Sequence, residues 1–202
     1  MGNITKQVWA IILAAGFSKR MGAPKLLLPY KGKPLIRHMI DECLQSQVDG
    51  TIVVVNPEIE TLVAEVSMNG INKVVENYHS QDGMSTSLKI GLKSVPDDVN
   101  AVIFLLGDQP LMTANEINKI ISDYHSHQDA PIIQAKYEDG KGHPILFTKN
   151  MFPHLLCIDG DEGGKSVLMK FHKQVYYSEM NRKLIPDIDT HEDYQLLINE
   201  KN

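Results

Sequence analysis

Short apolar runs alternate with amphipathic stretches over the first two thirds of the chain. The runs contain few polar residues, which is typical of strands buried on both faces, and they predict strands over residues 9–13, 51–55, 74–75, 101–106 and 131–135. The stretches between them predict helices over residues 34–47, 58–69, 85–94 and 113–127. Strands that alternate with helices indicate βαβ units and a mostly parallel sheet, so we expect an α/β fold. Such sheets bind ligands at the carboxyl ends of their strands.

Local signals mark several of the predicted helix starts. Pro34 suits a first helical turn, and Thr113 with Glu116 can form a capping box. Thr190 is expected to cap a closing helix over residues 190–200. From about residue 141 the apolar pieces become shorter, and they predict further strands at residues 145–147, 175–177 and 184–185. No linker-like composition separates this part, so residues 1–202 are expected to form one domain whose later part is the second wall of a cleft.

The chain of 202 residues has a formal net charge of −5, which argues against nucleic acid as its main partner. Its two cysteines, Cys43 and Cys157, lie far apart and lack metal-site spacing, as in a reduced protein. The polar N-terminus lacks the apolar segment of a secretory signal. No apolar run approaches the roughly 18 residues that a membrane helix needs. We therefore expect a cytoplasmic protein with no membrane partner.

The loop after the first strand has the composition of a phosphate-binding loop. Ala14, Ala15 and Gly16 let a ligand come close to backbone N–H groups. Arg20 and Lys25 follow with no acidic residue in the loop, and two such cations suit a polyphosphate. The spacing fits neither the G-x-x-x-x-G-K-[ST] loop nor the G-x-G-x-x-G fingerprint. An ordinary glycine-containing turn is the alternative, and it would leave both cations unexplained.

Two aspartates are candidate metal ligands. Asp108 follows the predicted strand over residues 101–106, and a carboxylate at that end of a strand can hold Mg²⁺ against phosphate oxygens. The alternative is that Asp108 caps a turn before Pro110. Asp189 lies just before the closing helix, where it can support the same metal or serve only as an acidic residue at a helix start. Mg²⁺ is therefore the expected cofactor.

Three further segments contain candidate binding residues. Gly83 and Ser85 lie at a predicted helix start, where they can hold the ribose or base of a nucleotide, although a plain serine-capped helix fits as well. His143, within a Gly-His-Pro segment, is expected to face a cleft. The acidic, glycine-rich residues 159–165 lack the ligand pattern of a calcium loop, and we expect a mobile loop that faces the substrate.

Five segments spread over nearly the whole chain resemble, in order, the signatures of one enzyme family. They read LAAGFSKRMGAPKLLLPYKGKPL, GMSTSL, GDQPLM, GHPILF and DIDTHEDY, at residues 13–35, 83–88, 107–112, 142–147 and 187–194. Together they resemble the molybdenum cofactor cytidylyltransferase branch of the MobA-like nucleotidyltransferases. Two positions depart from the family pattern. Lys165 replaces the usual arginine, which weakens any inference of bidentate anion binding there, and His191 replaces a proline.

The resemblance implies a Rossmann-like three-layer α/β/α sandwich. It also implies transfer of CMP from CTP to molybdenum-bound molybdopterin, with release of pyrophosphate, for hydroxylases of the xanthine dehydrogenase type, one of which would be a transient partner. The catalytic residues it implies are Lys25, Arg20 and Asp108, and the metal ligands are Asp108 and Asp189. Gln109 and His143 are implied on the acceptor side. The implied nucleotide-binding residues are Leu13, Ala14, Ala15, Gly16, Arg20, Lys25, Gly83, Ser85 and Asp108.

The sequence offers no clear general base, and such a reaction needs none, because a phosphate monoester with a second pKa of about 6 is largely ionised at pH 7. Repulsion between two polyanions limits the reaction, and cations reduce that repulsion. Two other functions stay open at this point. One is nucleotidyl transfer with another nucleoside triphosphate or a sugar-phosphate acceptor, and the other is non-catalytic delivery of the molybdenum cofactor. The intact set of Arg20, Lys25 and Asp108 favours turnover over delivery.

Overall fold

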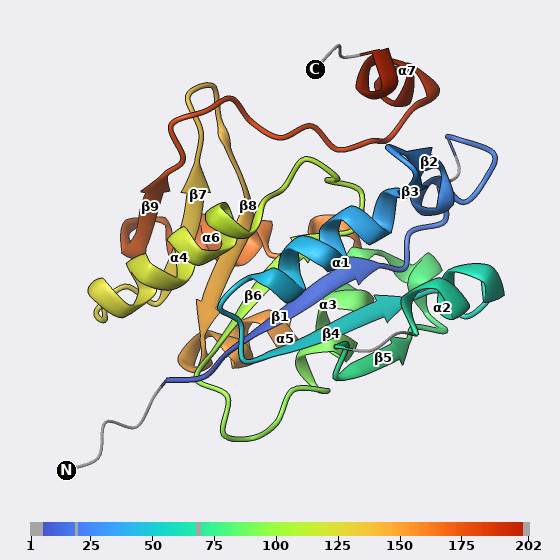
Figure 1. The fold of residues 1–202 in the computed structure, drawn as a ribbon. Helices are drawn as coiled ribbons and strands as arrows, with labels where there is room; N and C mark the ends of the chain where they lie inside the picture. Colours follow the sequence, from blue (N-terminus) through green and yellow to red (C-terminus); the bar gives the residue numbers. More distant parts are fainter. Residues whose placement is uncertain (1–5, 19, 68–69, 200–202) are drawn as a thin grey trace.

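A seven-stranded sheet forms the centre of the computed structural model, which describes residues 6–18, 20–67 and 70–199 (Figure 1). Its strands are β1 (Val8–Ala14), β4 (Gly50–Val55), β5 (Lys73–Glu76), β6 (Ala101–Leu106), β7 (Ile132–Lys136), β8 (Lys141–Thr148) and β9 (Val175–Glu179). They lie in the order β5-β4-β1-β6-β8-β7-β9. Strand β8 is antiparallel to both of its neighbours, whereas the other neighbouring strands of this sheet are parallel. The prediction of a mostly parallel sheet is confirmed.

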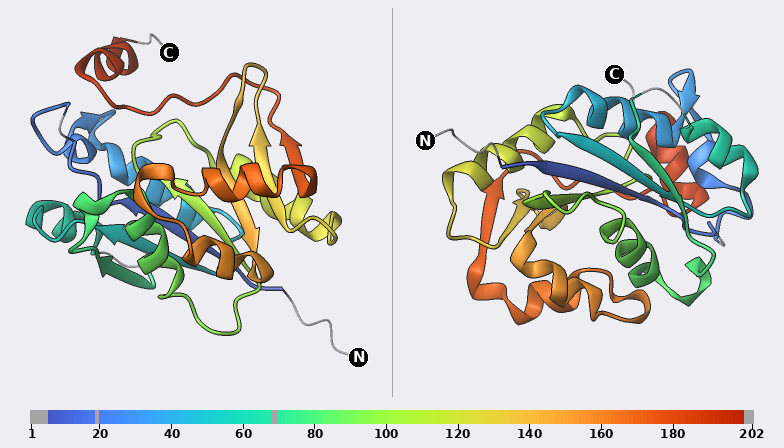
Figure 2. Two further views of the ribbon diagram at one scale, coloured as in Figure 1. Left: turned by 180° about the vertical axis from the view of Figure 1, so that it is seen from behind. Right: turned by 90° about the horizontal axis from the view of Figure 1, so that it is seen from below.

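Helices cover both faces of the sheet and complete three layers (Figure 2). One face packs against α1 (Leu35–Gln45), α2 (Glu60–Val66) and α4 (Ala114–Ser126). The other packs against α3 (Met84–Leu92), α5 (Phe152–Leu156) and α6 (Lys165–Lys170). The predicted Rossmann-like α/β/α sandwich is therefore confirmed. The remaining elements are the hairpin of β2 (Pro29–Tyr30) and β3 (Lys33–Pro34), helix α7 (His191–Asn199), and the 3-10 turns η1 (Lys25–Leu27), η2 (Ser80–Asp82), η3 (Lys149–Met151), η4 (Gly160–Glu162) and η5 (His172–Gln174).

The central strands are apolar throughout because both of their faces are covered. In β1, Ile12 packs into the cluster beneath α1 and α4, whereas Ile11 packs into the opposite cluster beneath α3. Gly107, directly after β6, has no room for a side chain, since a Cβ there would lie 2.7 Å from Cδ1 of Ile36. This close packing holds the end of β6 against β1 and α1. The next residue, Asp108, is thereby placed beside the loop that follows β1.

Side chains cap two helices as the sequence predicts. Thr113 and Glu116 form the capping box of α4. Oγ1 of Thr190 accepts the backbone N–H of Asp193 at 3.1 Å, at the start of α7. Pro34 directly precedes α1 instead of lying in its first turn. Three residues that were predicted to be helical lie outside the described part of the chain: Met68, Asn69 and Glu200.

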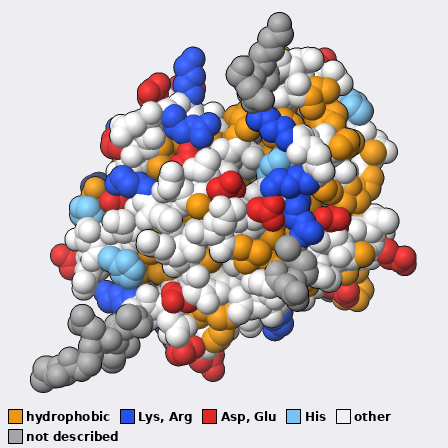
Figure 3. Space-filling model, in the orientation of Figure 1, with side chains coloured by type: hydrophobic (Ala, Val, Ile, Leu, Met, Phe, Trp, Pro, Cys, Tyr) orange, Lys and Arg blue, Asp and Glu red, His pale blue; other side chains and the backbone are white. Residues whose placement is uncertain are grey.

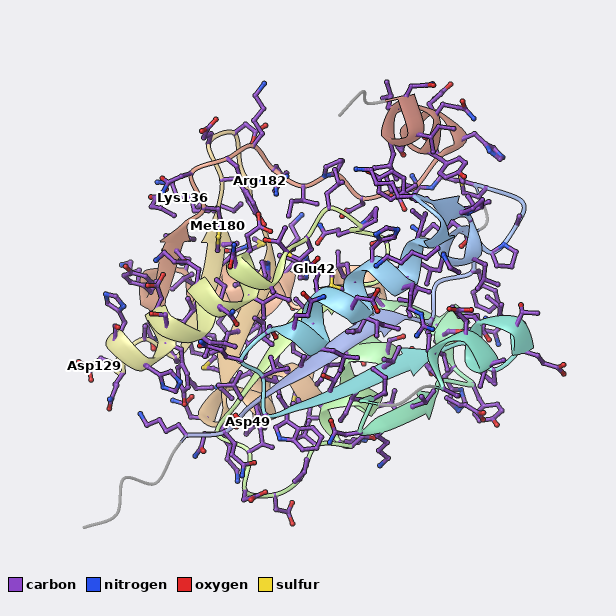
Figure 4. All side chains as sticks on the ribbon, in the orientation of Figure 1. Glu42, Asp49, Asp129, Lys136, Met180 and Arg182 are labelled. Atoms are coloured by element: carbon purple, nitrogen blue, oxygen red, sulfur yellow. The ribbon has the colours of Figure 1, made fainter. Side chains whose placement is uncertain are left out.

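The surface around α1 carries charges of both signs (Figure 3). Arg37 of α1 pairs with Glu65 of α2 at 3.1 Å. Oε2 of Glu42, which is labelled in Figure 4, accepts the first backbone N–H of α4, from Ala114, at 2.8 Å. These contacts join α1 to the helices on either side of it. Within the described residues, none of the helices is long and apolar enough to cross a membrane.

The predicted strand at residues 184–185 is wrong, because this segment pairs with no strand of the sheet. Pro186 has no N–H to donate to a neighbouring strand, and the N–H of Leu184 donates instead to Oδ1 of Asp139 at 2.7 Å. Ile185 is buried in the core cluster that contains the inner face of α4. The apolar pair therefore serves core packing in an extended segment.

The segment after β9 passes the carboxyl end of β6 on its way to α7 (Figure 1). At its start, Nη1 of Arg182, labelled in Figure 4, pairs with Oε1 of Glu116 at 3.0 Å. Further along, the N–H of Ile188 donates to the carbonyl oxygen of Asp108 at 3.0 Å. Helix α7 then packs against the β2–β3 hairpin through Leu197. This path brings acidic residues from the end of the chain to the loop that follows β1.

Candidate active site

The loop after β1 turns back and brings Lys25 to the carboxyl end of the sheet. Ser18 adopts a left-handed backbone conformation with a φ of 52°, which is uncommon for residues other than glycine. Its Oγ accepts the backbone N–H of Lys25 at 3.2 Å, and its carbonyl accepts the N–H of Met21 at 2.9 Å. A Cβ built on Gly16 would meet no atom of the described residues within 4 Å, its two chain neighbours apart. The loop backbone at Gly16 is therefore open to a ligand.

The side chain of Lys25 joins two carboxylates from distant parts of the chain. Nζ donates to Oδ2 of Asp108 at 2.6 Å and to Oδ1 of Asp189 at 2.7 Å. Burial opposes the charge of this side chain, which is only 10% exposed, but the two carboxylates outweigh burial and hold the pKa of Lys25 above its ordinary value. Lys25 is therefore charged at neutral pH. The structure brings together three residues that the sequence predicted for one site.

Arg20 extends this ion-pair network toward solvent. Its Nη2 donates to Oδ2 of Asp189 at 2.8 Å. Burial alone would raise the pKa of the Asp189 carboxyl, but Lys25 and Arg20 outweigh burial and lower that pKa. The side chain of Arg20 is 67% exposed, and an exposed ion pair contributes little to stability. This exposed position leaves Arg20 accessible to an anion in the cavity that it lines.

One oxygen of Asp108 is left unpaired. Oδ2 binds Lys25, whereas Oδ1 is buried and has no hydrogen-bond partner among the described residues. The described residues also contain no group of three or more His, Cys, Asp or Glu side chains that could hold a metal. Mg²⁺ usually takes only about one or two protein carboxylates and completes its shell with water and phosphate oxygens. Asp108, with Asp189 on the other side of Lys25, fits such an ion when a phosphate ligand accompanies it.

The first of two adjoining cavities surrounds these charges and has a volume of about 480 Å³. Met84 and Ser87 from α3 form part of its wall. Gly83 and Ser85 lie behind that wall, since a Cβ on Gly83 would lie 2.4 Å from the carbonyl carbon of Gly160 and Ser85 is buried. Their contact with a nucleotide stays a prediction. The predicted residues that do line the cavity are Leu13, Ala14, Ala15, Gly16, Arg20, Lys25, Asp108 and Asp189.

A second cavity, of about 350 Å³, adjoins the first. Gln109 and His143, the two residues predicted on the acceptor side, both line it. Burial lowers the pKa of His143 to about 4, so its imidazole is neutral at pH 7. Much of the remaining wall is apolar, including Phe104, Ile145 and Phe147. The residues that line both cavities are Leu13, Met84, Leu106 and Asp187.

Asp187 is a residue of this site that sequence reasoning missed. Its Oδ1 accepts a hydrogen bond from Nε2 of Gln109 at 2.7 Å. Burial, together with the negative charge of Asp108, raises the pKa of the Asp187 carboxyl. The spacing of Asp187 and Asp189 was the available signal, because alternate residues of an extended segment face the same side. Ile188, which lies between them, is buried in a hydrophobic cluster.

The acidic loop that was predicted to face the substrate borders both cavities. Asp161 lines the first cavity, and Lys165 lines the second. Oδ1 of Asp161 accepts the backbone N–H of Met84, the first residue of α3, at 3.3 Å. Asp159 pairs with Lys89 of α3 at 2.7 Å. The loop therefore lies against α3 at the edge of the site, and its mobility stays a prediction.

The two cavities can hold two ligands side by side. The first presents two cations and two paired aspartates, which suit a polyphosphate together with a hard metal ion. The second presents neutral polar groups on a largely apolar wall, together with the exposed lysines Lys141 and Lys165, and Asp187 lies at the junction. Holding two reactants next to each other is itself a large part of catalysis in group transfer.

Comparisons with known proteins agree with this chemistry. The family model described as "MobA-like NTP transferase domain" matches residues 10–175. The 2-C-methyl-D-erythritol 4-phosphate cytidylyltransferase of Desulforamulus reducens is 36% identical over 128 residues, which are 61% of this chain and 53% of that protein, so the match spans about half of that relative's length. The purine catabolism protein PucB of Bacillus subtilis is 26% identical over 196 residues, which are 93% of this chain and 94% of that protein.

Solved structures show the same architecture over nearly the full chain. Rv0371c from Mycobacterium tuberculosis H37Rv superposes with a TM-score of 0.85 at 28% identity, covering 96% of this chain and 98% of that chain. A structure of Rv0371c in complex with manganese superposes with a TM-score of 0.82 at 26% identity, covering 96% and 99% of the two chains.

Proposed function

Because the chain belongs to the family of MobA-like NTP transferase domains, we propose that it transfers CMP from CTP to the terminal phosphate of molybdenum-bound molybdopterin. One observation carries the proposal. Nζ of Lys25 lies between the carboxylates of Asp108 and Asp189, in a cavity that adjoins a second one with a largely apolar wall. A triphosphate in the first cavity meets Lys25 and Arg20, and an acceptor in the second cavity lies next to it.

In the proposed reaction a terminal phosphate oxygen of the acceptor attacks the α-phosphorus of CTP. A new P–O bond forms while the bond between the α-phosphorus and the α–β bridging oxygen breaks, and its electron pair leaves with pyrophosphate. No net proton transfer is needed, because the acceptor phosphate, with a second pKa of about 6, is largely ionised at pH 7. Lys25 and Arg20 reduce the repulsion between the two polyanions and stabilise the charge that develops on pyrophosphate.

Asp108 and Asp189 are the proposed ligands of Mg²⁺. Bound there, the ion would neutralise phosphate charge and help pyrophosphate to leave. The unpaired Oδ1 of Asp108 supports this assignment, as does the manganese complex of the similar protein Rv0371c. In the proposed ligand complex, Lys25 donates its hydrogen bonds to phosphate oxygens instead of to the carboxylates.

The choice of substrates has separate support. The similar protein from Desulforamulus reducens is named a cytidylyltransferase, which favours CTP as the donor. The segments GDQPLM, GHPILF and DIDTHEDY favour molybdenum-bound molybdopterin as the acceptor, through their resemblance to the molybdenum cofactor branch of the family. The proposal includes action in the cytoplasm and transient contact with a hydroxylase of the xanthine dehydrogenase type.

Pyrophosphate release tests the proposal, with purified molybdopterin cofactor, Mg²⁺ and each of the four ribonucleoside triphosphates. We expect kcat/KM for CTP to exceed that for GTP by about tenfold or more, which needs only a difference of about 1.4 kcal/mol in transition-state binding. Equal kcat/KM values, or a preference for GTP, would contradict CTP as the preferred donor. Release with a sugar phosphate but not with molybdopterin would sink the acceptor. Tight cofactor binding without release would point to a delivery protein.

A further inference from the structure

A polar residue interrupts the apolar pattern of β7. The apolar residues of this strand, Ile132, Ile133 and Ala135, are fully buried. Gln134 lies among them and is only 8% exposed. An amide in a buried strand costs free energy unless it is paired. A residue that breaks the local pattern without a structural partner is expected to serve a function.

Both ends of the Gln134 amide are open to the second cavity, which this residue lines. No hydrogen bond joins the side chain to any other residue in the described part of the chain. The side-chain atoms that are both fully buried and unpaired belong to other residues, among them Gln109. The amide of Gln134 therefore keeps accessible surface at both ends, and a ligand in the cavity can reach its oxygen and its nitrogen.

Strand β8 is irregular beside Gln134. In the ladder of β7 and β8, Ile145 faces Gln134, whereas Gly142 faces the next residue of β7. The two residues of β8 between them, His143 and Pro144, form a bulge. Bulges redirect side chains beside binding sites. His143 also lines the second cavity, and because burial lowers its pKa to about 4, it adds an uncharged polar group there at pH 7.

Apolar rings form the wall next to the amide. Phe104 of β6 faces Ile145 in the neighbouring ladder, and its ring packs edge-on against Phe147 with the two centroids 6.0 Å apart. All three of these side chains line the second cavity. An apolar wall around one unpaired amide suits a flat, neutral heterocycle with a polar edge.

The cations of this cavity are exposed. Lys141 and Lys165 are the described lysines that line it, and both are exposed to solvent. Nζ of Lys141 lies 3.8 Å from the centroid of the Tyr177 ring, and Tyr177 faces Gln134 in the ladder of β7 and β9. Exposed ammonium groups suit the phosphate of an acceptor, whereas the buried amide suits its ring.

We propose that Gln134 pairs through both ends of its amide with a lactam edge, an N–H beside a C=O, on the neutral ring of the acceptor and thereby determines acceptor specificity. This inference rests on the proposed function, in which the acceptor carries a pterin ring with such an edge. Nε2 of Gln134 donates to the ring carbonyl, and Oε1 accepts from the ring N–H. A site that is built to pair with both groups rejects a ring that lacks one of them, because its own polar atom then stays unpaired.

Two ligands and two variants test the inference. Pterin carries the lactam N–H, whereas 3-methylpterin has a methyl group in place of that hydrogen. Gln134→Met removes the amide at similar length, and Gln134→Leu replaces it with a residue that the apolar strand favours. Gln128→Met is the matched control, since Gln128 is exposed and lines neither of the two cavities. The readouts are Kd for both pterins, from their fluorescence, Kd for CTP with Mg²⁺, and KM with molybdopterin.

We expect the parent and Gln128→Met to bind pterin about tenfold more tightly than 3-methylpterin, which corresponds to about one hydrogen bond. Gln134→Met and Gln134→Leu should bind pterin about tenfold more weakly than the parent and should bind both pterins with Kd values within about twofold of each other. In both variants KM for molybdopterin should rise about tenfold, and Kd for CTP should stay within about twofold. Damage to the cavity alone would instead weaken both pterins and keep their ratio.

Equal parental affinities for the two pterins overturn the inference, and so does a parental preference that persists in either folded variant. If neither variant folds, nuclear magnetic resonance of the isotope-labelled parent decides. A shift of the Gln134 side-chain amide signal with pterin that is absent with 3-methylpterin supports the inference, and equal responses to the two ligands overturn it.

The parent protein separates this inference from the proposed function. A parent that releases pyrophosphate with molybdopterin, together with an unchanged pterin preference in Gln134→Met, overturns the role of Gln134 and leaves the function standing. A parent that neither binds pterin nor uses molybdopterin overturns both.

Discussion

The two neighbouring cavities satisfy their polar groups in opposite ways. In the first, the two cations Lys25 and Arg20 pair with the two carboxylates Asp108 and Asp189 through hydrogen bonds of 2.6, 2.7 and 2.8 Å. In the second, where the lysines are exposed, Gln109 and His143 are neutral, and no described residue donates to the side-chain carbonyl of Gln109. Buried charges are tolerated only when they are paired. The charged side chains of the first cavity therefore pair with one another until a ligand takes the place of these partners.

This difference predicts which ligand each cavity needs. A polyanion with its metal ion can replace the internal ion pairs of the first cavity without leaving a charge unpaired. A neutral ring with N–H donors can complete the second cavity without adding charge. Single substitutions can test which ligand each cavity binds, and the first cavity depends most on the charge of Lys25.

The largest effect is expected from Lys25→Met, which keeps most of the apolar stem of the side chain and removes its charge. Turnover should fall about 100-fold or more, because a buried charge directed at developing phosphate charge contributes several kcal/mol to the transition state. Pyrophosphate release under single-turnover conditions measures the effect. Lys119→Met is the matched control, since Lys119 is an exposed residue of α4 that pairs with Asp123 of the same helix, and it should turn over at the parental rate. Parental turnover in Lys25→Met would show that the first cavity does not hold the triphosphate.

A similar loss of turnover, about 100-fold, is expected for Asp108→Asn, because an amide is a much poorer ligand for Mg²⁺ than a carboxylate. Without ligands, the Tm should stay within about 4 °C of the parent, since Lys25 keeps Asp189 as its partner. The stabilisation by CTP that depends on Mg²⁺ should disappear in thermal melts. An aspartate that only shapes a turn would tolerate asparagine. Retained activity at ordinary magnesium concentrations would therefore remove the metal role from Asp108 and shift it to Asp189.

Removal of the Lys25 charge is expected to lower turnover but to raise the affinity for a metal ion in the absence of nucleotide. The Lys25 ammonium occupies the two carboxylates that we propose for the metal, so it competes with a free divalent ion. Lys25→Met should bind free Mn²⁺ about tenfold more tightly than the parent, a difference of about 1.4 kcal/mol, although the variant has lost turnover. Titration of free Mn²⁺ by electron paramagnetic resonance measures both affinities. Equal or weaker binding by the variant would show that Lys25 does not compete with the metal.

The smallest effect is expected in the second cavity and depends on pH. Burial lowers the pKa of His143 to about 4, whereas an unfolded histidine titrates at about 6.5. Between these values the unfolded chain binds a proton that the folded protein excludes. The stability that depends on neutral His143 is therefore complete above about pH 6.5 and is lost as the pH falls toward 4.

His143→Gln should reduce the fall in Tm between pH 6.5 and pH 4.5 by about 2–4 °C. Melting curves across this pH range measure the change of Tm with pH. As a control, His125→Gln, on the exposed side of α4, should show the same change of Tm with pH as the parent. An unchanged slope in His143→Gln would mean that the imidazole is not shielded from water in the folded protein.

The sequence predicted those parts of the molecule that depend on local patterns and on the rules of parallel sheets. Asp108 and the loop that holds Lys25 each follow a buried strand, and the carboxyl ends of neighbouring parallel strands meet, so their proximity was predictable. The strand at residues 184–185 was wrong because the partner of the Leu184 N–H is a distant side chain, Asp139. An apolar pair carries no information about such a contact.

Less of the second cavity could be predicted from the sequence. Gln109 and His143 were assigned to the acceptor side by resemblance, and both line the cavity. The hydrogen bond between Gln109 and Asp187 joins residues 78 positions apart, so no local pattern reveals it. Gly83 and Ser85 lie behind the wall that Met84 and Ser87 form, because the orientation of each residue at the start of α3 depends on its packing against the loop at Gly160.

The central claim is that the first cavity binds the nucleotide and the second cavity binds the ring of the acceptor. The most direct test measures two dissociation constants, for CTP with Mg²⁺ and for pterin, in Lys25→Met and in Gln134→Met. The account predicts that Lys25→Met weakens CTP binding about tenfold or more and changes pterin binding less than about twofold, and that Gln134→Met does the reverse. Equal weakening of both ligands by either variant, or an exchange of the two effects, would contradict the division.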